Sequence, residues 1–209
     1  LEKQKIEEEL AIAREIQRNL LPGEFQTIQG IQLEAVNISS QSVGGDYYDV
    51  LDFADSTHGI VIADVSGKGV PASLLMANVQ ASFHALSEMM VNPARLVEKI
   101  NDIIYKNTSS DKFITLFYFR LYPDERRIEY CNAGHNHPFI ISKSGKVKYL
   151  DQGGLIIGMM PEIDYLMDSV VLQSGDSFIM YTDGVSEALN TENEEFGEDR
   201  LLEICQKMR

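Results

Sequence analysis

VIADVSGKGVPASLLM, residues 61 to 76, is the stretch that decides the expected fold of this chain. Its apolar start completes a run, residues 59 to 65, with the length and β-branched composition of a strand. A glycine-rich turn follows, and Pro71 stands where a helix can begin, because proline is tolerated at the first helical position. The residues expected to face inward from that helix are Leu74, Leu75, Val79, Phe83 and Leu86.

The chain on either side of this stretch predicts further strands and a second helix. Strands are expected at residues 31 to 37 and 46 to 53, with residues 52 to 59 forming a hairpin loop. Asn92 and Pro93 are a cap-then-proline signal for a second helix. Its expected inward residues are Leu96, Val97, Ile100, Ile103 and Ile104.

Strands return after Asp111, and a final helix is expected from Glu198 to the end. The strands are predicted at residues 113 to 121, 127 to 132, 138 to 142, 147 to 150, 169 to 172 and 177 to 182. Because strands come in groups on both sides of two helices, the order indicates an α+β fold rather than alternating βαβ units.

The first 20 residues predict a helix with a narrow apolar stripe. The stripe has the spacing of a coiled-coil seam, with Gln17 interrupting it, and consists of Ile6, Leu10, Ala13 and Leu20. Pro22 and Gly23 end the helix. Such a helix either packs on its own domain or pairs with a second copy in a coiled coil.

Composition narrows the class of protein. At 44% hydrophobic and 24% charged residues, the chain is typical of a soluble globular protein, and it has neither a leader nor a long apolar run, so we expect no membrane insertion and a cytoplasmic location. A net charge of -14 argues against a nucleic-acid partner, suits metal cations, and also serves solubility. Cys131 and Cys205 lack metal-ligand spacing, and we expect reduced structural residues.

Three Asp and Gly clusters are the candidates for chemistry. Each puts a carboxylate beside glycines at the expected end of a strand, and the three aspartates are Asp46, Asp64 and Asp183. Glycines let carbonyl groups and water approach an ion, and all-oxygen ligands suit Mg²⁺ or Mn²⁺. A single Asp-Gly pair is commonly only a turn. The three together indicate a site for a hard cation.

Other kinds of site are less well supported. The SGKG sequence lacks the P-loop pattern because Lys68 is followed by Gly69, although backbone N–H groups at the following helix could still bind an anion. His135 and His137 would share one face of a strand as a metal pair, but no third nitrogen or sulfur ligand is nearby, which favours a polar turn. No motif supplies a Ser or Cys nucleophile.

Five segments in order resemble the PPM-type metal-dependent protein phosphatases of the SpoIIE/RsbU branch. The segments are VGGDYYDV (43 to 50), VIADVSGKGVPASLLM (61 to 76), CNAGHNHP (131 to 138), YTDGVSEALN (181 to 190) and EFGEDRL (195 to 201). The resemblance covers residues 12 to 209. It implies an antiparallel β-sandwich flanked by α-helices, with a centre of two Mn²⁺ or Mg²⁺ ions at one edge.

The resemblance also implies a role for each candidate residue. Asp64 matches the carboxylate that bridges the two ions, the Val65 carbonyl matches the backbone ligand beside it, and Asp183 matches a ligand of one ion. Asp46 matches a carboxylate that acts directly or through metal-bound water. The implied reaction is hydrolysis of a phosphoserine or phosphothreonine by metal-activated water, with no protein nucleophile.

The resemblance further implies a signalling context. Residues 1 to 22 match a linker and dimerisation helix that follows an upstream sensory or receiver domain, and residues 23 to 209 match the phosphatase domain. The implied substrate is a phosphorylated anti-sigma-factor antagonist of the STAS type, and the implied assembly is a homodimer.

One departure from the family is visible. Family members carry a further aspartate, in an Asp-Asp-x-Thr sequence on a last strand, and we expect this domain to lack that strand because the sequence stops at Arg209. Asp199 is a possible substitute, but its position matches the segment before the final helix. A second hypothesis is therefore a catalytically weak or inactive module for binding and signal relay, and a third is a hydrolase of small phosphate esters.

Overall fold

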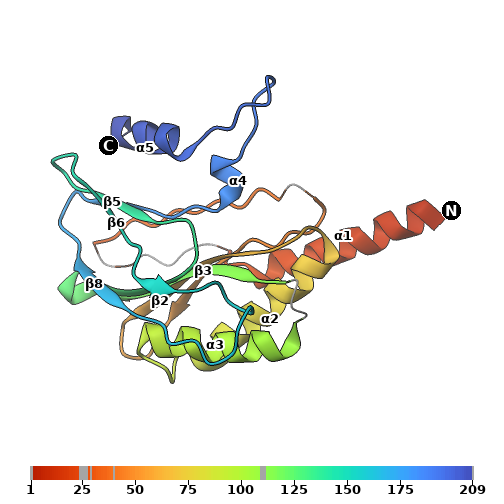
Figure 1. Cartoon of the computed structure of the whole chain (residues 1–209), viewed down its shortest axis with the longest axis horizontal. Helices are drawn as coiled ribbons and strands as arrows, with labels where there is room; N and C mark the ends of the chain where they lie inside the picture. The colour runs from red at the N-terminus through yellow and green to blue at the C-terminus, as the bar shows by residue number, and fades with distance from the viewer. Residues whose placement is uncertain (1, 24–27, 29, 40, 109–111, 209) are drawn as a thin grey trace.

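The computed structural model describes residues 2–23, 28, 30–39, 41–108 and 112–208, and these form an α+β fold of two sheets between helices (Figure 1). The helices are α1 (Glu2–Leu20), α2 (Val70–Leu86), α3 (Pro93–Asn107), the short α4 (Asp183–Ser186) and α5 (Glu198–Lys207), with a 3-10 turn at Pro123–Glu125. Helices α2 and α3 cover one face of the larger sheet, and α5 lies on the far side of the smaller one.

The larger sheet has six strands. They are β1 (Tyr47–Asp52), β2 (His58–Val65), β3 (Ile114–Tyr122), β4 (Arg127–Ala133), β7 (Gly153–Gly154) and β8 (Asp168–Val171), in the order β1-β2-β3-β4-β7 with β8 also on β4. Only β4 and β7 pair in parallel. The smaller sheet is antiparallel and has the order β6 (Val147–Tyr149), β5 (Phe139–Ile141), β9 (Ser177–Ile179). The predicted α+β sandwich is confirmed.

Aromatic residues fill the spaces between the layers. Between the helices and the larger sheet, the ring of Phe83 packs against the rings of Tyr47 and Tyr118, with centroids 6.3 and 5.3 Å away. Between the two sheets, Phe117 stacks on Tyr130 at 5.5 Å. Successive residues of β3, such as Phe117 and Tyr118, thus point into opposite cores, as the two-residue period of a strand requires. Both faces of the larger sheet are therefore buried.

The sequence signals predicted for the starts of α2 and α3 are confirmed. Gly69 precedes α2 with φ 71° and Pro71 lies in the first turn, where its missing N–H leaves no hydrogen bond unmade. The Asn92 side chain accepts a hydrogen bond of 3.1 Å from the backbone N–H of Arg95 at the start of α3.

Two expectations about this part of the chain are wrong. Residues 31 to 37 form no strand, because no neighbouring strand in the described part of the chain pairs with them, and a strand without a ladder is not stable. Leu74 is 68% exposed. Ala72 and Met76 are buried instead, since adjacent helical positions point about 100° apart and Leu74 and Leu75 cannot both face the sheet.

The ends of several other elements also differ from expectation. The predicted strand at residues 177 to 182 stops at Ile179, and the short helix α4 begins at Asp183. Helix α5 ends at Lys207 rather than at the end of the chain. Leu1, Asp111 and Arg209 lie outside the described residues.

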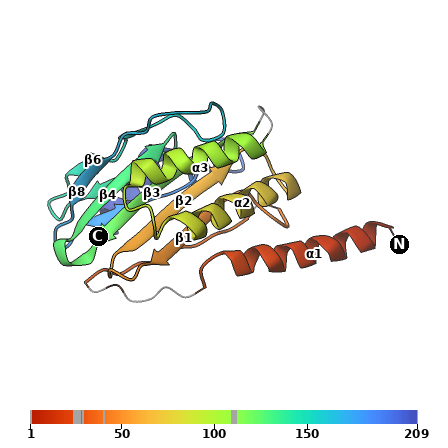
Figure 2. The same ribbon diagram turned by 90° about the horizontal axis from the view of Figure 1, so that it is seen from below.

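Helix α1 lies beside α2 and extends past it (Figure 2). None of its described residues is fully buried, although Leu10, Ala13 and Leu20 of the predicted stripe are half-buried, as is Gln17, which interrupts the stripe. Ile6 is 52% exposed. The C-terminal half of the stripe therefore packs on its own domain, while pairing with a second copy stays a prediction. None of the described helices has the length and apolar character needed to cross a membrane.

We expect Phe83→Ala to destabilise the domain by about 3–5 kcal/mol, because it empties a fully buried site between two tyrosine rings. Leu74→Ala on the same helix is the matched control and should change the free energy of unfolding by about 0.5 kcal/mol or less. Urea unfolding followed by circular dichroism measures both. An equal decrease in the free energy of unfolding for the two variants would contradict the packing described for α2.

Candidate metal centre

Asp64 lies near the end of β2, in the middle of the larger sheet. The antiparallel register places it opposite Thr115 of β3, and the backbone N–H of Val65 donates a hydrogen bond to its carboxylate. Pairing on both sides of β2 fixes this position. The sheet thus presents the Asp64 carboxylate at the end of an inner strand, as the sequence predicted.

Asp46 reaches the same end of β2 because two glycines precede it. A Cβ atom on Gly45 would lie 2.7 Å from the carbonyl oxygen of Val65, which is too close for any other residue without a backbone shift. Gly45 therefore lets the Asp46 segment pass directly over the end of β2. The carbonyl of Val65 and the carboxylates of Asp46 and Asp64 become neighbours.

Asp183 comes from the other sheet. The chain leaves β9 and enters α4 at Asp183, whose carbonyl accepts a hydrogen bond of 2.7 Å from the backbone N–H of Glu187. Its charge acts on both Asp46 and Asp64. Asp183, at the start of α4, is thus brought within electrostatic reach of two aspartates that are far away in the sequence.

The cluster of three carboxylates is under electrostatic strain. Burial, followed by the charges of Asp46 and Asp183, raises the pKa of Asp64 to about 7. Burial also raises the pKa of Asp46, and hydrogen bonds with the side chains of Asp64 and Thr182 oppose that shift. A hydrogen bond between two carboxyl groups requires a proton on one of them, so Asp46 and Asp64 share a proton when no cation is bound.

These residues fit a divalent cation. Among the described residues, no salt bridge to Lys, Arg or His neutralises Asp46, Asp64 or Asp183, and the oxygen donors suit Mg²⁺ or Mn²⁺. In the described part of the chain, no group of three or more His, Cys, Asp or Glu side chains is already arranged to hold one ion. The carboxylates are therefore gathered and repel one another, and a cation would relieve the repulsion.

The two histidines do not form a metal pair. His137 is exposed, whereas His135 is 2% exposed and its Nδ1 lies 2.9 Å from the hydroxyl of Thr115. The Asn132 side chain accepts from the backbone N–H of His135 at 2.7 Å and donates to its carbonyl at 3.1 Å. Burial lowers the pKa of His135 to about 4, so the ring is neutral. The polar-turn interpretation is confirmed.

Two threonines near the cluster were not predicted as site residues. Thr182 forms a side-chain hydrogen bond with Asp46, and Thr115, on the strand beside Asp64, lies against His135. In the YTDG segment only Asp183 was predicted to act at the site, and Thr115 lay in a predicted strand, where threonine is common. The alternative ligand Asp199 is exposed in the first turn of α5, and its charge is not among those that shift Asp46 or Asp64. The anion site predicted at SGKG stays a prediction.

Known proteins are similar to this chain in sequence and in fold. The family model described as Stage II sporulation protein E (SpoIIE) matches residues 54–209. The phosphoserine phosphatase RsbU of Bacillus subtilis (strain 168) is 31% identical over 191 residues, which cover 91% of this chain and 56% of RsbU. The chain therefore spans little more than half the length of this relative.

Two solved structures are similar in fold. The SiaA-PP2C domain of Pseudomonas aeruginosa has a TM-score of 0.78 at 22% identity, covering 99% of this chain and 83% of that chain. RsbX in complex with magnesium has a TM-score of 0.59 at 20% identity, covering 83% of each chain. At these identities the likeness concerns the fold alone.

We expect Gly45→Ala to weaken Mn²⁺ binding about tenfold or more, because the new methyl group would push the Val65 carbonyl out of place. Gly184→Ala is the matched control, since a Cβ there has its nearest neighbour 3.9 Å away. Calorimetric titration with Mn²⁺ compares the two variants. Wild-type affinity in Gly45→Ala would count against the Val65 carbonyl as a ligand.

We expect Asp64→Asn to stabilise the metal-free protein. The pKa of Asp64 in the folded state, about 7, is raised above its ordinary value of 3.8, so ionisation disfavours folding as pH rises through this interval. The gain should be complete above pH ~7 and vanish below pH ~4, and we expect about 2–4 °C in Tm at pH 8. Thermal unfolding of both proteins in EDTA, at pH 8 and below pH ~4, measures this difference in Tm. A lower Tm at pH 8 would contradict the repulsion.

Proposed function

This chain belongs to the SpoIIE family of PP2C-type phosphatases, and we propose that it is a metal-dependent phosphatase of phosphoserine and phosphothreonine in a protein substrate. The observation that carries the proposal is the gathering of Asp46, Asp64 and Asp183 from three separate segments. Three mutually repelling carboxylates have no structural benefit of their own. They suit a reaction in which cations must be held beside a phosphate.

We propose that Asp46, Asp64, Asp183 and the Val65 carbonyl hold two ions, Mn²⁺ or Mg²⁺. Such ions supply Lewis-acid chemistry to phosphate ester hydrolysis. The magnesium in the RsbX structure is consistent with this choice in a protein of the same fold. The family resemblance gives Asp64 the bridging position, where cations would offset the burial and the charges of Asp46 and Asp183 that raise its pKa.

The protein's own residues favour direct hydrolysis over a covalent intermediate. Burial raises the pKa of the Cys131 thiol to about 12 and also raises that of Cys205, so neither thiol forms a thiolate at neutral pH. His135, which could otherwise act as a base, is buried in a turn and bonded to Thr115. The Thr182 hydroxyl holds Asp46 in place, which leaves the carboxylates to orient the reacting groups.

We further propose the signalling context that the family resemblance implies. The substrate would be a phosphorylated STAS-type anti-sigma-factor antagonist, and α1 would connect the domain to an upstream sensory or receiver domain and pair with a second copy. RsbU, a phosphoserine phosphatase, supports the chemical class of the substrate. The half-buried stripe of α1 supports a helix that can transmit movement to the domain.

The test is hydrolysis of a phosphoserine protein and of p-nitrophenyl phosphate by the full-length protein with Mn²⁺. Asp64→Asn should reduce kcat by about a thousandfold or more, because the bridging ligand is lost. Asp199→Asn is the matched control and should keep wild-type turnover, since Asp199 lies outside the cluster. Wild-type activity in Asp64→Asn would overturn the mechanism, and Mn²⁺ binding without turnover would favour the signal-relay module.

A further inference from the structure

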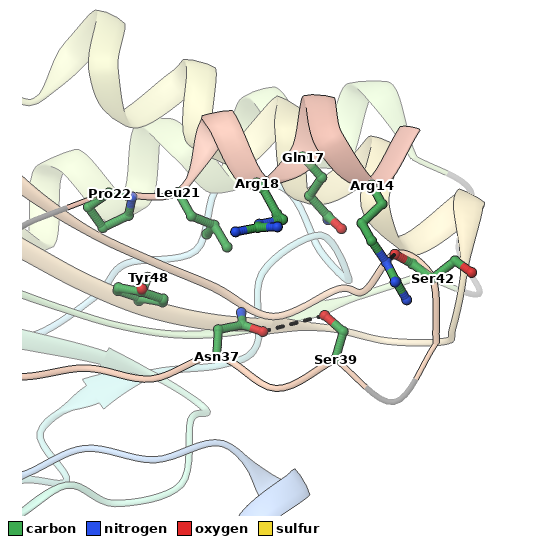
Figure 3. Close-up of a pocket in the computed structure, with 10 residues that line it drawn as sticks. Arg14, Gln17, Arg18, Leu21, Pro22, Asn37, Ser39, Ser42 and Tyr48 are labelled. Carbon is green, nitrogen blue, oxygen red and sulfur yellow. Dashed lines mark hydrogen bonds between the residues drawn. The ribbon is translucent and has the colours of Figure 1, made fainter. Parts of the chain in front are cut away.

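A cavity of about 520 Å³ lies between helix α1 and the chain that leads to β1 (Figure 3). We call it the α1 pocket. Arg14, Gln17 and Arg18 reach into it from α1, and Asn37, Ser39 and Tyr48 lie on the opposite side. It lies apart from the carboxylate cluster, which is not among its lining residues.

The α1 pocket is cationic in an acidic protein. The chain has a net charge of -14, yet the described residues that line this cavity include two arginines and no Asp or Glu. Arg14 and Arg18 are four residues apart on one helix face, where like charges repel. Arg18 forms no salt bridge with any residue that the structure describes. An anion bound in the cavity near both guanidinium groups would offset this repulsion.

The donors in the pocket match a phosphate group. Arg14 donates its Nε–H to the Ser42 carbonyl at 2.7 Å and an Nη2–H to the Gln41 carbonyl at 3.5 Å, whereas its Nη1 donates to no residue that the structure describes. Ser39 donates to the side-chain oxygen of Asn37 at 3.4 Å, and the amide N–H₂ of Asn37 donates to no residue that the structure describes. Guanidinium groups pair with two oxygens at once, and a phosphate dianion offers more acceptor oxygens and more charge than a carboxylate.

The pocket is connected to the candidate metal centre through the chain that carries Asp46. Between the two arginines, Gln17 donates to the carbonyl of Gly44 at 2.7 Å and accepts from its N–H at 3.0 Å. Gly44 lies two residues before Asp46, and Tyr48 of β1 lies two residues after it. Because α1 has no fully buried residue, its position depends strongly on these polar contacts.

We propose that the α1 pocket binds a phosphate group through Arg14 and Arg18, and that the bound group holds α1 against the Asp46 segment. The phosphate could be free, as released by the proposed reaction, or part of a phosphoserine side chain. Its effect on Asp46 rests on the proposed function, whereas binding itself does not. The ligand would favour the docked position of α1 because it contacts both the helix and the segment beneath it.

The test is calorimetric titration of the full-length protein with inorganic phosphate in EDTA, where the metal centre cannot contribute. Arg18→Gln should weaken phosphate binding about tenfold or more, the effect of losing a charged hydrogen-bond donor. Arg95→Gln is the matched control on α3, where the side chain is 68% exposed and paired with Glu98 at 2.6 Å, and it should bind phosphate as the wild type does. Equal affinity in wild type and Arg18→Gln, or no binding at millimolar phosphate, would overturn the proposal.

Two further measurements sharpen the result. Asp64→Asn should bind phosphate in EDTA with wild-type affinity, because Asp64 does not line the α1 pocket. If the pocket proposal fails, phosphate does not bind in EDTA. If the proposed function fails, phosphate still binds but Asp64→Asn keeps its catalytic activity. A phosphoserine peptide that binds at least about tenfold more tightly than inorganic phosphate, with the same loss in Arg18→Gln, would identify a phosphoprotein as the source. Similar affinities would identify free phosphate. An unchanged Tm for Arg18→Gln would show that the loss is not due to unfolding.

Discussion

The pairing of β2 with β3 is the interaction on which the fold and the candidate site both depend. It extends over eight residue pairs and lies at the centre of the larger sheet, between the two buried layers. Tyr118 of β3 packs toward the helices and Phe117 packs toward the smaller sheet. The same ladder ends where Asp64 stands opposite Thr115. A shift of one residue would exchange the two faces and move Asp64 away from the edge.

The carboxylate cluster shows how a stable scaffold can hold an unfavourable arrangement. Burial, together with repulsion from Asp46 and Asp183, raises the pKa of Asp64 and costs folding free energy at neutral pH, and the buried apolar surface of the two cores offsets this cost. Each carboxylate is positioned by backbone rather than by an opposing charge: the end of β2, the glycines before Asp46, and the start of α4. A site held in this way is ready for cations, because no Lys or Arg among the described residues must first be displaced.

Helix α1 is attached to the domain differently from α2 and α3. Those two helices bury aliphatic and aromatic side chains, whereas α1 relies on half-buried residues and on hydrogen bonds from Arg14 and Gln17. Polar contacts of this kind are weaker and easier to exchange than a packed core. A helix so attached is suited to change position, and the segment that it contacts leads directly to Asp46.

The sequence alone determined the α+β class, the two central helices with their caps, and the identity of the candidate carboxylates, because these depend on local patterns of apolar residues, glycine, proline and Asn92. The strand predicted at residues 31 to 37 was wrong, because a local sequence pattern does not reveal whether a partner strand exists. Only the tertiary structure decided that Asp183 acts on Asp46 and Asp64, that Gly45 passes over the Val65 carbonyl, and that Arg14 and Arg18 face a cavity whose described lining residues include no carboxylate. The physical reason is that each of these depends on distances between segments far apart in the chain, which are set by sheet register and packing between layers.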